Sequence, residues 1–125
     1  MIDWQVMVEG EIPLGWDRHK DGCWFPDFGA QSFLLPHFNV GNSPIDEFGK
    51  TVFDGDDMQR LRTHLLWQRS YLEAKVEKWT ITETDGDRSS SYTVEREVVL
   101  RVVDKTLVII ERAGELKGEL VFFGD

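Results

Sequence analysis

The side chains most able to bind a metal ion or act as a nucleophile lie in residues 16–38, WDRHKDGCWFPDFGAQSFLLPHF. They hold the only cysteine, Cys23, and two of the three histidines, His19 and His37. Thiolate and imidazole groups are the ligands that zinc prefers. His19 and Cys23 are four residues apart, which would suit one metal ion on a helix, but Gly22 between them disfavours a helix. Because the sequence also lacks C-x-x-C, H-x-x-x-H and H-E-x-x-H motifs, we predict no metal and no other cofactor.

A thiol beside an imidazole could also act as a catalytic nucleophile with its base. A reactive thiol needs a lowered pKa and therefore electropositive surroundings, whereas Asp17, Asp21 and Asp27 flank Cys23 in the sequence. The chain lacks the G-x-S-x-G motif of a catalytic serine and the G-x-x-x-x-G-K-[ST] loop that binds phosphate. We therefore favour a protein that is not an enzyme, and keep an enzyme as the alternative.

Two acidic clusters, FDGDD at 53–57 and TDGDR at 84–88, contain carboxylates of the kind that a calcium ion needs. Neither matches the full calcium-binding loop, which ends in a distal Glu. Asp54, Asp56 and Asp57 directly precede a helical pattern, where short acidic side chains accept backbone N–H groups and complement the helix dipole. We expect these three residues to cap a helix and to present negative charge to a partner.

Six aromatic residues lie in the same irregular segment as Cys23. They are Trp16, Trp24, Phe25, Phe28, Phe33 and Phe38. The first interpretation is that they pack over the sheet as a long, aromatic-rich loop, because large apolar rings are stabilised by burial. The second is that part of this loop forms a binding surface, since long ordered loops often carry function and Trp is enriched at binding hot spots.

Charge narrows the class of partner. Fourteen Lys and Arg against 23 Asp and Glu give a net charge of −9. A nucleic-acid-binding protein would carry the opposite excess, so we exclude nucleic acid as a partner and expect a basic protein instead. We also expect no membrane association and a cytoplasmic protein, because no apolar run is long enough to span a bilayer and MIDWQVMVEG does not resemble a signal peptide. A single cysteine permits no intrachain disulfide.

Hydrophobic periodicity predicts the elements that position these residues. Alternation predicts a strand at 2–8, and Met58, Leu61, Leu65, Leu72, Val76 and Trp79 recur at helical steps, which predicts an amphipathic helix over 56–79. Further short strands are expected at 50–53, at 79–84 and in the last residues, ELVFFGD, with a short strand or helical turn at 31–35 and a loop at 85–91.

The segment 94–114 is ambiguous. Its β-branched residues would suit two strands joined at Asp104-Lys105. Its charged residues, however, form a stripe with steps of three, four and seven, and this favours one helix that ends at Gly114.

The predicted fold is a single α+β domain over residues 1–125. It has a small, mainly antiparallel sheet of three to five strands, one or two amphipathic helices on one face, and a long aromatic-rich loop. The predicted function is a small acidic protein-binding module, which could be an inhibitor, that neutralises a basic partner through Asp54, Asp56, Asp57 and Trp24. The alternative is a small-molecule-binding protein or enzyme with an aromatic-lined pocket around Trp16, Trp24 and His37. The sequence leaves the oligomeric state open.

Overall fold

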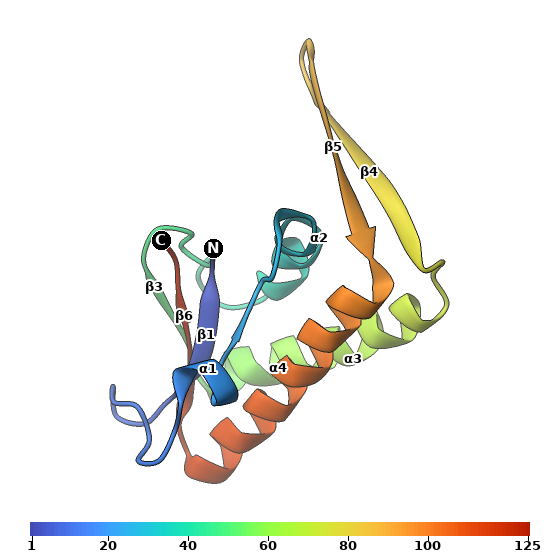
Figure 1. Cartoon of the computed structure of the whole chain (residues 1–125). Coiled ribbons are helices and arrows are strands. Elements are labelled where there is room, and N and C mark those ends of the chain that lie inside the picture. Colours follow the sequence, from blue (N-terminus) through green and yellow to red (C-terminus); the bar gives the residue numbers. More distant parts are fainter.

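Four antiparallel strands form the central sheet, in the order β2-β1-β6-β3. Figure 1 shows β1, β6 and β3 side by side. The computed structural model describes the backbone of residues 1–125 and every side chain except that of Arg18. The strands are β1 (Asp3–Met7), β2 (Cys23–Trp24), β3 (Lys50–Phe53) and β6 (Glu119–Phe123). The last strand of the chain lies between β1 and β3, with Trp4 opposite Phe122 and Phe53 opposite Leu120. The strands expected at 2–8, at 50–53 and in the final residues are confirmed.

Four helices and a separate hairpin complete the α+β domain. The helices are α1 (Arg18–Asp21), α2 (Phe28–Phe38), α3 (Gly55–Glu73) and α4 (Arg96–Leu116), and the hairpin consists of β4 (Lys78–Asp85) and β5 (Arg88–Glu95). Helix α4 packs against β1, β2 and β6, while α3 packs against α4, β3 and β6. The hairpin connects α3 to α4 and projects away from the sheet (Figure 1). None of the described helices is long and apolar enough to cross a membrane.

Trp4 lies at the centre of the core. Its ring contacts Phe25, Phe38 and Phe122, with centroid distances of 4.7, 5.1 and 5.5 Å. The indole Nε1–H donates a hydrogen bond of 3.1 Å to Oγ1 of Thr106 on α4. A buried indole thus has the polar partner that burial requires. This one side chain therefore joins the sheet to α4 and to the segment that precedes α2.

The helix expected over 56–79 is shorter than its periodicity suggested. Met58, Leu61, Leu65 and Leu72 are buried as predicted, but α3 ends at Glu73 and Val76 is 64% exposed. Trp79 is the second residue of β4. Val76 lies in the turn between α3 and β4, so the prediction that it belongs to the apolar face of this helix is wrong.

Two further segments contain more regular structure than expected, although a helical turn was one of the two alternatives for 31–35. Residues 31–35 belong to α2, which begins after Asp27, whose side chain accepts the Ala30 N–H at 2.7 Å. The segment 28–38 is therefore helix and not part of a long loop. The loop expected at 85–91 is only a tight turn, because β5 starts at Arg88 and Gly86 adopts a φ of 61°. Positive φ in a two-residue hairpin turn suits glycine.

The helix expected over 94–114 is confirmed as α4, but Gly114 lies inside it. The helix ends instead at Leu116. The cap residue Lys117 has a φ of 55°, and the Gly118 N–H donates to the Ala113 carbonyl at 2.8 Å. This is the Schellman pattern, which satisfies carbonyls left free at a helix end. The residue after this cap must be small, because a Cβ at Gly118 would lie 2.7 Å from the Met7 carbonyl oxygen.

Candidate functional site

The outward side of α3 exposes two aromatic rings. Trp67 is 62% and Tyr71 44% exposed, although both are large and partly apolar. They are four residues apart and therefore neighbours on the helix surface. Their rings stack nearly parallel, with 6.1 Å between centroids and an interplanar angle of 11°. The amine of Lys75 lies over the Tyr71 ring at 5.4 Å.

A groove runs along α3 from Trp67 toward the start of the helix. It is lined by Val40, Asp56, Gln59, Arg60, Thr63, His64 and Trp67. Asp56 and Trp67 are both exposed, and they lie near opposite ends of this groove. The groove therefore has an acidic end and an aromatic end.

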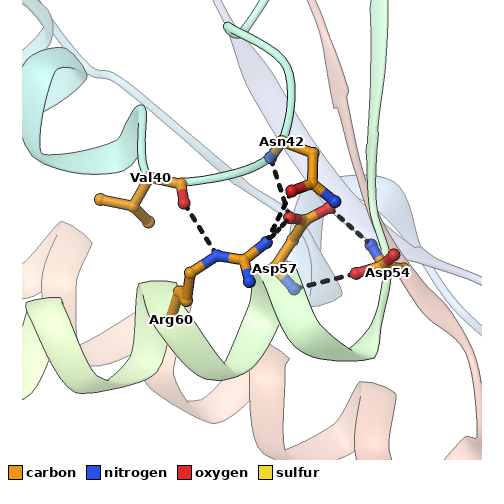
Figure 2. Close-up of polar contacts among 5 residues, drawn as sticks. All are labelled: Val40, Asn42, Asp54, Asp57 and Arg60. Atoms are coloured by element: carbon orange, nitrogen blue, oxygen red, sulfur yellow. Dashed lines mark hydrogen bonds and ion pairs between the residues drawn. The ribbon is translucent and has the colours of Figure 1, made fainter.

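Figure 2 shows the contacts at the acidic end, where the loop before β3 meets α3. Asp54 and Asp57 form a capping box: Asp54 Oδ1 accepts the Asp57 N–H at 2.9 Å, and Asp57 Oδ2 accepts the Asp54 N–H at 3.3 Å. Asp57 also accepts the Asn42 N–H at 2.9 Å and forms an ion pair with Arg60. Arg60 in turn donates to the Val40 carbonyl at 3.1 Å. The network holds the loop onto the helix.

The same contacts set the protonation state of Asp57. Burial raises the pKa of its carboxyl group, but the N–H groups of Asn42 and Asp54 and the guanidinium of Arg60 outweigh burial and hold the pKa below its ordinary value. Asp57 is buried and its charge is used within the chain. Of the three aspartates predicted to bind a partner, only Asp54 and Asp56 are exposed, and Asp54 is also the helix cap.

A histidine pair lies between α2 and α3. His37 Nδ1 is 3.1 Å from His64 Nε2, and the rings are stacked with 5.3 Å between centroids. Burial, and then the proximity of His64, lowers the pKa of His37. One imidazole must donate and the other accept, so the contact is lost when both are protonated. Phe33 packs on His37, with 5.5 Å between ring centroids.

The alternative pocket predicted around Trp16, Trp24 and His37 is divided in the structure. Trp24 and Trp16 line two clefts along α4 that both include Lys105, whereas His37 contacts His64 of α3. Trp24 is 45% exposed, and the Lys105 amine lies 5.1 Å from its ring centroid. Trp24 thus has a basic neighbour and is not part of the α3 surface.

Cys23 and His19, the two residues weighed as metal ligands, lie close together in the structure. Both line a small cleft beside Trp4 and Trp24. Among the side chains that the structure describes, no group of three or more His, Cys, Asp or Glu residues could hold a metal ion. Burial raises the pKa of the Cys23 thiol, against smaller opposite effects of Thr106 and Lys105, so the thiol is neutral at pH 7.

Sequence reasoning missed Trp67, Tyr71 and His64. Their signal was present, because 64, 67 and 71 are spaced by three and four residues within a predicted helix and avoid its buried Leu61, Leu65 and Leu72. The approach of His64 to His37 had no such signal, since it depends on how α2 packs against α3.

Comparisons of the chain with protein-family models, with curated proteins and with solved structures find no match. The function is therefore inferred from the chain's own side chains.

Proposed function

We propose that this chain is a protein-binding module that recognises a basic partner protein through the groove of α3. The observation that carries the proposal is the exposed, stacked pair of Trp67 and Tyr71 beside that groove. Exposed aromatic rings that already hold one geometry lose little conformational freedom on binding, and Trp and Tyr dominate the energetics of many interfaces.

The charge of the chain supports a basic partner. The net charge is −9, and Asp56 lies exposed in the groove while Asp54 is exposed at its helix cap. The negative field attracts a positively charged protein from a distance and so raises the association rate. Desolvation of Trp67 and Tyr71 then limits dissociation. The acids and the rings thus act on different rate constants.

An inhibitor is the specific form of this module that we propose. A small acidic protein that covers a basic surface competes with whatever that surface normally binds. In this form, the groove of α3 covers a functional basic site of the partner, and the Trp67 ring is the main apolar contact.

The experiment is affinity capture with three baits: the unmodified protein, Trp67→Ala, and Phe48→Ala as the matched control. Phe48 is 83% exposed and lies outside α3, in the loop before β3. We expect the unmodified protein and Phe48→Ala to retain the same basic partner, and Trp67→Ala to lose it, because an aromatic hot spot contributes about 2 kcal/mol or more to binding.

The captured partner then allows a kinetic test. Raising salt from about 50 to 500 mM shortens the reach of the field from over 10 Å to roughly 4 Å, so the association rate should fall about tenfold or more while dissociation changes little. An acidic partner, an association rate indifferent to salt, or equal losses for Trp67→Ala and Phe48→Ala would each refute the proposal.

A further inference from the structure

A second candidate site lies on the other long helix, between α4 and the turn that follows β2. This cleft has a volume of about 350 Å³. It is lined by Cys23, Trp24, Pro26, Asp27, Val98, Arg101, Val102 and Lys105. The α4 residues occupy positions 98, 101, 102 and 105, which form one face of a helix. The volume lies within the range of about 300–1,000 Å³ that is usual for small-molecule sites.

The inner wall of the cleft is apolar. Val102 and Cys23 are each 5% exposed, and the half-exposed indole of Trp24 stands beside them. Because burial raises its pKa, the Cys23 thiol is uncharged at pH 7 and packs as a small apolar group. Such a wall suits a flat, apolar ligand that packs against the indole of Trp24.

The rim of the cleft is positively charged, in contrast to the chain as a whole. Arg101 and Lys105 lie one helical turn apart, and the Lys105 amine is held over Trp24. Among the described side chains, Arg101 has no carboxylate within salt-bridge distance. The acids on this part of α4 are engaged elsewhere: Asp104 binds Arg69 of α3 at 2.7 Å, and Glu97 binds Arg96 at 3.2 Å.

The one acid in the cleft is Asp27, and it opposes an anionic ligand. Its Oδ1 accepts the Ala30 N–H that begins α2, which uses part of its charge. Two cations against one capping carboxylate leave the cleft with a net positive lining.

From these features we propose that the cleft binds a small aromatic carboxylate, a function separate from partner binding by α3. The ring packs against Trp24, Val98 and Val102, and the carboxylate pairs with Arg101 and with Lys105, whose amine lies over the indole. A guanidinium matches a carboxylate because both are planar and can form two parallel hydrogen bonds.

The test uses benzoate as the probe and benzamide as the uncharged control of the same shape. Binding is followed on the unmodified protein through the indole N–H signal of Trp24 in ¹H–¹⁵N spectra. We expect benzoate to shift this signal in a saturable way and to bind about tenfold more tightly than benzamide, since a charged hydrogen bond is worth more than a neutral one. Equal affinities, or no saturable shift of the Trp24 signal, would overturn the proposal without affecting the α3 surface.

A pair of variants locates the charge that matters. Arg101→Gln should weaken benzoate binding by about fivefold to tenfold, because it removes the guanidinium that faces the carboxylate. Arg62→Gln changes the net charge equally but lies exposed on α3, and it should leave benzoate affinity unchanged. Equal weakening by both variants would show that only the net charge of the protein matters and would also overturn the proposal. Melting temperatures of both variants establish that they are folded.

Discussion

The aromatic residues of this protein form two groups with opposite environments. Trp4, Phe25, Phe38 and Phe122 meet in the core, where rings from β1, α2, β6 and the segment before α2 pack at tilted or edge-on angles. Trp67 and Tyr71 lie together on one helix and stack in parallel at the surface. The core group depends on the whole fold, whereas the surface pair depends only on α3.

This difference teaches what each group contributes. A ring that is buried on all sides stabilises the folded state, because removing it leaves a cavity. A ring that remains exposed on a rigid helix can instead be buried by a partner, and its burial then stabilises the complex. The following predictions test this division.

The largest effect is expected for Phe122→Ala. Phe122 is fully buried and its ring contacts Trp4, Phe38 and Phe53. Its removal should lower the free energy of unfolding by about 3–5 kcal/mol, measured by chemical denaturation. Trp67→Ala should cost about 0.5 kcal/mol or less, because the ring is largely exposed. If both variants lose the same stability, the division between the groups fails.

The two sides of α3 provide the next comparison. Leu65 is fully buried on the inner side, and Leu65→Ala should cost about 2–5 kcal/mol through lost burial and a residual cavity. Arg62 lies on the exposed side of the same helix, so Arg62→Ala should cost within roughly 0.5 kcal/mol. Equal melting temperatures would show that the helix presents a different face to the core.

Asp57 tests whether the start of α3 is held by a buried charge. Asp57→Asn should lower the free energy of unfolding by about 1–3 kcal/mol, because Arg60 and the capping box lose a charged acceptor. The matched control is Asp56→Asn, an exposed residue of the same helical turn, which should cost below about 1 kcal/mol.

The direction of the Asp57 pKa shift predicts how the stability of the protein depends on pH. The folded pKa of Asp57 lies below the ordinary value of about 3.9, so its stabilisation is complete above that pH and is lost as pH falls through the folded pKa. Unfolding measured from pH 5 to about 2 should therefore show a shallower loss in Asp57→Asn than in the unmodified protein. An identical acid dependence would contradict the role given to this carboxylate.

The smallest effect is expected at the His37–His64 pair, which lies between the core and the surface. The pKa of His37 is lowered in the folded state, so stability is complete above its ordinary value of about 6.5 and declines as pH falls below it. His64→Gln should reduce this decline between about pH 7 and 5, because it removes the second positive charge. His19→Gln, at an exposed position, should leave the decline unchanged. Thermal unfolding of both variants across this pH range measures the decline in stability. Equal changes in the two variants would contradict the effect of His64 on His37.

The sequence predicted much of the fold from local patterns. The strands at β1, β3 and β6 follow from alternation or short apolar runs, and the helix α4 follows from its stripe of charges. The prediction was wrong at the end of α3. The spacing of Leu72, Val76 and Trp79 suits a continuing helix, yet α3 ends at Glu73 and a strand begins at Lys78.

The candidate sites were predicted less completely. Trp24 is exposed, as a binding residue needs to be, but the prediction joined it to acidic residues, whereas its neighbour is Lys105. Trp67 and Tyr71 could have been recognised from their four-residue spacing. No pattern predicted the contact between Trp24 and Lys105, because these residues belong to different elements.

By itself, the sequence determined the α+β class, the positions of most elements and the negative charge. Periodicity depends on near neighbours in the chain, and the net charge is a sum over residues, so neither requires the tertiary structure. Only the tertiary structure decided which aromatic rings became buried around Trp4 and which stayed exposed on α3. It also decided that His37 meets His64 and that Trp24 forms a cleft with α4. The physical reason is that these contacts join residues distant in the chain, and their geometry is set by how the helices pack on the sheet.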